Sequence, residues 1–127
     1  MGDLVLQSEF TLNAPAMQLP DGTKMKLANF ADIFLGVNAR ENTNLAYFAS
    51  PSSWITKSMP LTLIQSGAAD AVVPIECSRE IAAKIRDVCG NEHIVYDEFP
   101  DYAHGDERFT EDSNIARMID WLKQALS

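Results

Sequence analysis

The stretch that most constrains the fold runs from residue 61 to residue 74, with the sequence LTLIQSGAADAVVP. It begins with an apolar run, breaks at Gly67, carries one acid, Asp70, and ends at Pro74, where a helical pattern starts. A buried strand, a loop that bears a carboxylate and a helix that begins at proline are typical of half a βαβ unit. Loops at the carboxyl ends of such strands tend to carry function, so Asp70 is a candidate functional residue.

The second half of the chain has clear periodicity. We predict a strand over residues 61–66, a helix from Ile75 to Cys89, a second strand over residues 93–99, and a last helix for which Thr110 is the N-cap. The order of these elements predicts an α/β fold with two parallel strands. Both helices should bury an apolar face, formed by Cys77, Ile81, Ile85 and Val88 in the first and by Ile115, Met118, Ile119, Leu122 and Leu126 in the second.

The first sixty residues are less regular. The segment Leu4–Phe10 fits a short strand or one turn of helix. Pro-Asp-Gly at residues 20–22 predicts a tight turn. Short helices are predicted within residues 27–35 and 41–48, the second of which should stop before Pro51.

The composition excludes several classes of function. A net charge of −8 argues against binding to nucleic acid or to an anionic membrane surface. No apolar run approaches the roughly 20 residues of a membrane span. The first ten residues lack the basic start and apolar centre of a signal peptide, so we expect a cytoplasmic chain.

Two cysteines and two histidines give little support for a disulfide or a metal site. Cys77 and Cys89 lie twelve positions apart on one predicted helix, which separates them by roughly 18 Å, too far for a disulfide. No Cys-x-x-Cys spacing accompanies His93 and His104. We therefore expect neither a metal nor a cofactor.

One acid and one histidine follow the two predicted strands. Asp70 follows the first strand and His104 follows the second, so parallel pairing should bring both loops to the same edge of the sheet. There the Asp70 carboxylate would hold the His104 imidazole as an acid–base pair. From spacing alone, the alternatives stay open: Asp70 as a cap of the following helix, and His104 as a solvated loop residue.

Several motifs resemble the end of an α/β-hydrolase of the bacterial esterase/lipase group, which includes feruloyl-esterase-like enzymes. Residues 66–74, SGAADAVVP, are similar to that family's His-Gly-x-x-Asp-x-x-Val-Pro, in which the Asp is the triad acid. Residues 102–105, YAHG, resemble the segment that carries the triad base. The resemblance implies catalytic roles for Asp70 and His104 and a partial α/β-hydrolase fold. It also implies one domain over residues 1–127, with residues 1–58 as an insertion or cap-like segment and residues 59–127 as the β-α-β-α end.

The sequence departs from this family in one decisive respect. The family's nucleophile lies in Gly-x-Ser-x-Gly, and no two glycines of this chain are four positions apart. Ser66 and Ala71 replace the family's usual His and Pro, but neither is a triad position. We therefore expect a C-terminal esterase fragment that is inactive alone and whose parent acts on a small-molecule ester. Replacing Ser50 or Ser53 by Ala should leave hydrolysis unchanged.

Two alternatives and one expectation about assembly remain. The chain could instead be a non-catalytic interaction module, or a small nucleotide-binding α/β domain, although residues 67–70 lack the glycines and lysine of a phosphate loop. The strand at 61–66 should have one unpaired edge unless Leu4–Phe10 pairs with it. Unpaired apolar edges recruit other chains, so we expect a homodimer or higher oligomer.

Overall fold

The computed structural model describes residues 3–127, except for the side chain of Met17. The expectation about a signal peptide therefore falls partly outside the described residues, because it includes Met1 and Gly2. Within the described residues, no helix is both long and apolar enough to cross a membrane.

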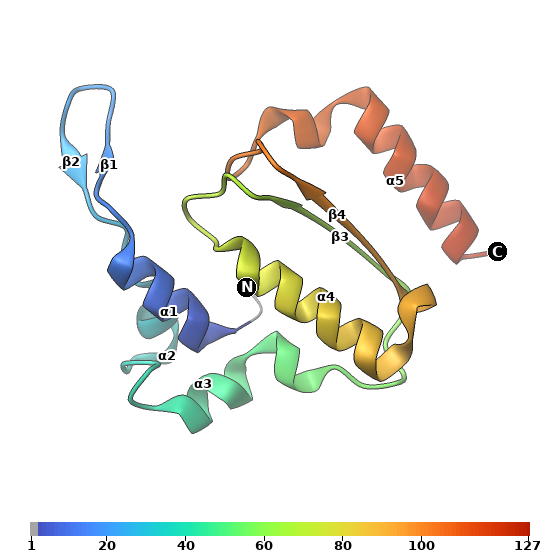
Figure 1. The fold of residues 1–127 in the computed structure, drawn as a ribbon, viewed down its shortest axis with the longest axis horizontal. Helices are drawn as coiled ribbons and strands as arrows, with labels where there is room; N and C mark the ends of the chain where they lie inside the picture. Colours follow the sequence, from blue (N-terminus) through green and yellow to red (C-terminus); the bar gives the residue numbers. More distant parts are fainter. Residues whose placement is uncertain (1–2) are drawn as a thin grey trace.

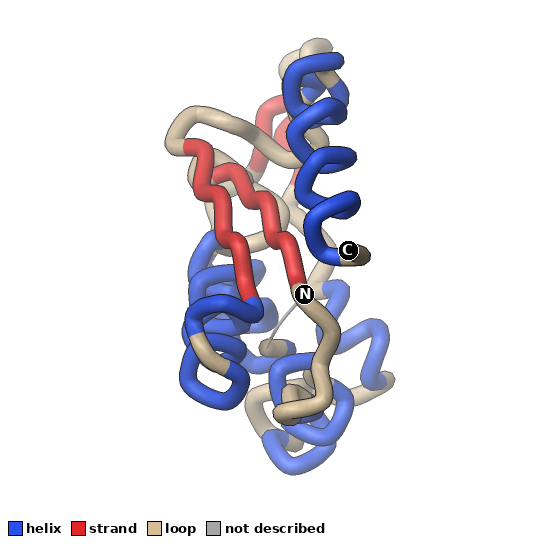
Figure 2. Tube along the Cα trace, turned by 90° about the vertical axis from the view of Figure 1, so that its right-hand side faces the viewer, coloured by secondary structure: helices blue, strands red, loops and turns tan. Residues whose placement is uncertain are grey.

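The centre of the fold is a pair of parallel strands, β3 (Thr62–Gly67) and β4 (Ile94–Phe99). Helix α4 (Ile75–Cys89) connects them, and helix α5 (Asp112–Ala125) follows β4 (Figure 1). In Figure 2 the two strands lie between the helix that ends at the C-terminus and the other helices. The predicted β-α-β-α order and the parallel pairing are confirmed.

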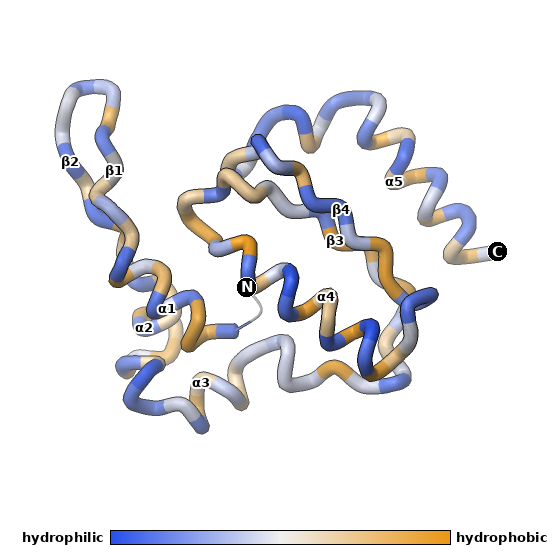
Figure 3. The backbone as a smooth tube through the Cα atoms, viewed as in Figure 1, coloured by the Kyte–Doolittle hydropathy of each residue, from blue (hydrophilic) through white to orange (hydrophobic). Residues whose placement is uncertain are grey.

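Helix α4 packs on the sheet through the apolar face that its sequence predicts. Its bounds match the prediction, and Gly90 ends it with a φ of 104°. Ala82, Ile85 and Ile94 are buried together, with Ile64 and Tyr96 packed against them. Full burial of an Ile side chain stabilises a fold by about 1.5–3 kcal/mol. Figure 3 shows the corresponding alternation of hydrophobic and hydrophilic residues along α4.

Helix α5 differs from the prediction. None of its residues is buried, and its apolar stripe is exposed, with Ile119, Leu122 and Leu126 at 45%, 48% and 84%. The predicted buried face is therefore wrong for the described chain. Polar contacts hold α5 to the sheet instead: Asn114 exchanges two hydrogen bonds with Gln65 of β3, at 2.8 and 2.9 Å, and Arg117 pairs with Asp97 of β4.

The predicted N-cap of α5 is also wrong. Thr110 ends a short 3-10 helix, η3 (Glu107–Thr110), and its hydroxyl donates to the Glu107 carbonyl at 2.8 Å. Glu111 is the N-cap residue, without a side-chain cap. The Thr110 hydroxyl therefore stabilises the preceding 3-10 turn and does not cap α5.

The first part of the chain is a small helical cluster. It comprises α1 (Leu4–Asn13), α2 (Phe30–Leu35), α3 (Thr43–Ala49) and the 3-10 helix η1 (Pro51–Trp54). Their shared core contains Leu4, Ala31, Ala39 and Ala46. The two short helices predicted within this half are confirmed. A second short 3-10 helix, η2 (Asn91–His93), precedes β4.

The strand alternative for Leu4–Phe10 is wrong, because these residues belong to α1. Asp3 caps that helix by accepting a hydrogen bond from the Leu6 amide at 2.9 Å. The segment therefore does not pair with the free edge of β3, and the described strands leave that edge open.

A hairpin of β1 (Met17–Gln18) and β2 (Lys24–Met25) projects from the helical cluster (Figure 1). The predicted Pro-Asp-Gly turn forms its tip, where Gly22 has a φ of 83° and donates to the Leu19 carbonyl at 2.9 Å. Such positive φ values favour glycine because it has no Cβ.

Helix α1 contacts the loop after β3 through a buried side chain. Gln7 is 2% exposed, and its amide donates to the Val72 carbonyl at 3.0 Å. The helical cluster is thus attached to the loop that carries Asp70.

Candidate active site

Asp70 lies in the loop between β3 and α4, as the sequence predicts. Its Oδ1 accepts hydrogen bonds from the amides of Val72, at 2.7 Å, and Val73, at 2.9 Å. Its side chain is 15% exposed. These two bonds shape the turn that leads into α4 and occupy one of the two carboxylate oxygens. They do not cap the helix, because its N-cap is Pro74 and has no side-chain cap.

His104 uses the other carboxylate oxygen. Its Nδ1 lies 2.9 Å from Asp70 Oδ2, and its side chain is 55% exposed. Because an ionised carboxylate only accepts hydrogen bonds, this contact selects the tautomer with a proton on Nδ1. Nε2 then carries the free lone pair that a general base needs. The sequence predicted that these two side chains meet, and the structure brings them together.

Backbone hydrogen bonds join the two loops directly. The Ala68 amide donates to the Phe99 carbonyl at 2.8 Å, and the Ala69 amide donates to the Tyr102 carbonyl at 3.1 Å. A Cβ placed on Gly67 would lie 2.1 Å from the same Tyr102 oxygen. Glycine at this position therefore permits the close approach that sets Asp70 beside His104.

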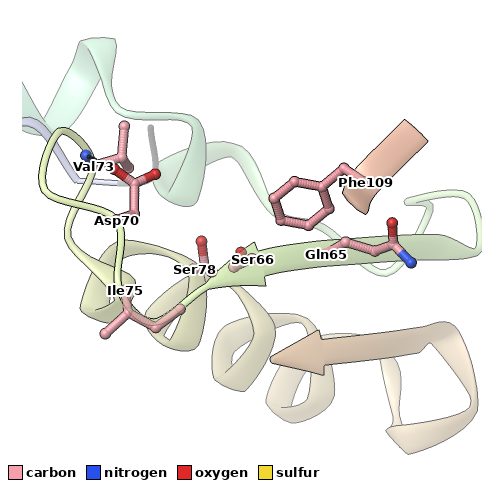
Figure 4. A pocket seen from close by; sticks show the side chains of 8 residues that line it. Gln65, Ser66, Asp70, Val73, Ile75, Ser78 and Phe109 are labelled. Atoms are coloured by element: carbon pink, nitrogen blue, oxygen red, sulfur yellow. Dashed lines mark hydrogen bonds between the residues drawn. The ribbon is translucent and has the colours of Figure 1, made fainter. Parts of the chain in front are cut away.

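A cavity of about 210 Å³ lies next to Asp70 at the carboxyl end of β3 (Figure 4). Figure 4 shows the side chains of Ser66 and Ser78 between the Asp70 carboxylate and the Phe109 ring. His104 does not line it. The residues around the cavity are Gln65, Ser66, Gly67, Asp70, Val73, Ile75, Ser78 and Phe109.

The hydroxyls of Ser50 and Ser53 form hydrogen bonds away from His104. Ser50 is 1% exposed, accepts from the Leu4 amide at 3.1 Å and donates to the Ala46 carbonyl at 2.7 Å. The Ser53 hydroxyl donates to the Tyr47 carbonyl at 2.5 Å. No serine or threonine hydroxyl hydrogen-bonds His104 in the described part of the chain. Cys77 is buried in α4, as predicted.

Sequence reasoning missed the residues that shape the His104 loop. Arg108 contacts both carboxylate oxygens of Asp106, and it also contacts Asp101. The Asp-x-Arg spacing directly after His104-Gly105 is the signal that would have indicated this cluster.

Comparison with known proteins supplies the family. The model of the BD-FAE family, a domain of esterase-like proteins, matches residues 10–85, which is more than half of the chain. The chain belongs to the BD-FAE family. The matched residues include Asp70 and end before His104. An esterase-related origin is therefore supported, as the sequence motifs predicted.

A solved structure shares the fold of this BD-FAE chain. It is the bifunctional GH43-CE protein of Bacteroides eggerthii, with a TM-score of 0.65 and 22% sequence identity. The similar region covers 87% of this chain and 14% of that one. No curated protein matches the sequence.

Proposed function

We propose that this chain supplies the acid and the base of a carboxylic ester hydrolase, and that the serine nucleophile comes from polypeptide outside it. The observation that carries the proposal is the hydrogen bond between His104 Nδ1 and Asp70 Oδ2, at 2.9 Å, together with the exposed imidazole. Membership in the BD-FAE family supports esterase chemistry.

The chemistry assigned to this pair is general base and then general acid catalysis. His104 Nε2 removes the proton of a serine hydroxyl as the oxygen attacks the ester carbonyl. The resulting imidazolium is stabilised by Asp70, and it returns the proton to the leaving alcohol. Water then cleaves the acyl-enzyme by the same two proton transfers, which releases the carboxylic acid and regenerates the serine.

The two roles of Asp70 are compatible because they use different oxygens. Oδ1 is held by the amides of Val72 and Val73, which leaves Oδ2 aimed at the imidazole. The carboxylate is thus fixed before any nucleophile arrives. Preorganised groups of this kind avoid the cost of reorientation during the reaction.

The test is reconstitution of a split esterase. The serine-bearing part of a BD-FAE esterase, truncated before the strand that corresponds to β3, is mixed with or fused to this chain, and hydrolysis of a p-nitrophenyl ester is followed. We expect no hydrolysis by this chain alone and measurable hydrolysis by the combination. His104→Ala and Asp70→Asn should each lower the reconstituted rate by about 10³–10⁴-fold. His93→Gln, which changes the other histidine, is the matched control.

Two results would contradict the proposal. Hydrolysis by the chain alone that is lost in His104→Ala would place a nucleophile within the chain itself. A folded combination that stays inactive would instead favour the non-catalytic interaction module.

A further inference from the structure

The loop that carries His104 contains a cluster of charge pairs centred on Arg108. Its Nε and Nη2 each lie 2.7 Å from one carboxylate oxygen of Asp106. Its Nη1 lies 2.7 Å from Asp101 Oδ2, and Nη2 also donates to the Asp101 carbonyl at 2.9 Å. One guanidinium thus joins both ends of the loop with a two-point, charge-assisted geometry.

The same guanidinium packs on an aromatic stack. Its carbon lies 3.9 Å from the centre of the Tyr102 ring. That ring stacks on Phe99 with centroids 4.4 Å apart, and Phe109 meets it edge-on at 5.0 Å. Because Phe99 ends β4, the guanidinium is anchored to the sheet as well as to the loop.

His104 lies inside the turn that this cluster closes. Asp106 Oδ2 accepts from the Ala103 amide at 3.2 Å, and the Asp106 amide donates to the Ala103 carbonyl at 3.3 Å. Gly105 has a φ of 64°, which lets the chain reverse directly after His104. The Asp106 carboxylate therefore fixes the turn from Ala103 to Asp106, and Arg108 holds that carboxylate in place.

We propose that Arg108 is a positioning residue: through Asp106 it fixes the turn that presents the His104 imidazole to Asp70. The catalytic meaning of this assignment rests on the proposed function, whereas the geometry can be tested in this chain alone. Isolated surface ion pairs contribute little, with a median of about 0–1 kcal/mol. Arg108 differs from them because it combines a bidentate pair, a second carboxylate and an aromatic face, and its side chain is only 34% exposed.

The ionisation state of Asp106 agrees with this role. Hydrogen bonds from Arg108 hold the pKa of the Asp106 carboxyl well below its ordinary value. The carboxylate that closes the turn is consequently charged at neutral pH.

The experiment measures the tautomer of the His104 imidazole and the exchange of its Nδ1 proton. Nitrogen-15 NMR of the full chain reports the tautomer of His104 and the rate at which its Nδ1 proton exchanges with water. We expect the Nδ1-protonated tautomer in the wild type. Arg108→Gln and Asp106→Asn should accelerate exchange of that proton by about 10-fold or more, because the bond to Asp70 would no longer be held in place.

Arg108→Lys separates geometry from charge. Lysine keeps the positive charge but lacks the planar fork and stacks poorly, so this variant should resemble Arg108→Gln. The matched control is Arg79→Gln, which breaks another two-point pair, to Glu98 at 2.9 and 2.6 Å, outside the His104 loop. It should leave the His104 signals unchanged.

The outcomes distinguish this inference from the proposed function. Unchanged exchange and tautomer in folded Arg108→Gln and Asp106→Asn chains would overturn the positioning role, whatever the activity. If the His104 Nδ1 proton of Arg108→Lys exchanges at the wild-type rate, the planar guanidinium is not required for the positioning role. In the reconstituted esterase, Arg108→Lys should lower kcat by about 10-fold with KM unchanged, since an interaction with the base alone does not bind substrate. A reconstitution that stays inactive while the NMR effect persists would refute the proposed function and leave the positioning role intact.

Discussion

Gly67→Ala tests the idea that one close backbone approach sets the acid beside the base. An added Cβ would lie 2.1 Å from the Tyr102 carbonyl oxygen and 2.7 Å from its carbonyl carbon. Ordinary van der Waals contact begins at 3.4 Å, so the Tyr102 loop has to shift by about 1 Å. His104 lies two residues beyond Tyr102 and should move with it.

Two effects lower the free energy of unfolding of Gly67→Ala. Overpacking of a tight site costs about 1–3 kcal/mol. Loss of the hydrogen bond from the Ala69 amide to the Tyr102 carbonyl, 3.1 Å long, adds about 0.5–1.5 kcal/mol. We expect the free energy of unfolding to fall by about 2–4 kcal/mol in urea titrations. At about 4 °C per kcal/mol for a chain of this length, Tm should fall by about 8–16 °C.

Gly36→Ala is the matched control. Gly36 has a φ of 70°, and a Cβ there would meet no atom within 4 Å. Only the cost of a left-handed conformation, about 1–2 kcal/mol, applies to it. A loss of stability in Gly67→Ala no larger than that in Gly36→Ala would contradict the role of the close approach. An unchanged NMR signature of the Nδ1–Asp70 hydrogen bond in folded Gly67→Ala would contradict it as well.

Three further predictions concern other parts of the molecule. Ser50→Ala leaves the buried Leu4 amide without its partner and should lower the free energy of unfolding by about 1–3 kcal/mol in urea, whereas Ser53→Ala should have little effect. Burial and the hydrogen bond to Glu98 raise the pKa of Tyr96 to about 12 from 10.0. Its contribution to stability is therefore complete below pH 10 and lost as pH rises through about 12, a loss that Tyr96→Phe should lack in alkaline unfolding. The open edge of β3 should cause self-association, and a monomer at every concentration in light scattering would contradict this.

The elements around β3 were predictable because their signals are local. An apolar run bounded by turn residues predicted the strand. Pro74 before α4 and Gly90 after it predicted the bounds of that helix to the residue. The meeting of Asp70 and His104 followed from topology, since parallel neighbours place their following loops at one edge of a sheet.

The buried face predicted for α5 is wrong, and the choice between strand and helix at Leu4–Phe10 stayed open, because a sequence pattern does not identify the element that packs against it. The stripe on α5 is regular, yet periodicity says only that one face is apolar and not which element covers it. Leu4–Phe10 mixes apolar and polar residues without a clear period, so propensity did not decide between strand and helix. The cap by Asp3 and packing against α2 and α3 decide it in the structure.

The contact between Asp70 and His104 depends on this chain's own backbone. Two amide-to-carbonyl hydrogen bonds join the loops, and two further amides fix one oxygen of Asp70. None of these contacts requires another polypeptide, so the pair is already assembled in this chain. In the proposed function, a complementing segment has to bring a hydroxyl within hydrogen-bonding distance of His104 Nε2 and to supply donors for the oxyanion. The His104 side chain is 55% exposed, so in the proposed function a hydroxyl from outside this chain can approach it.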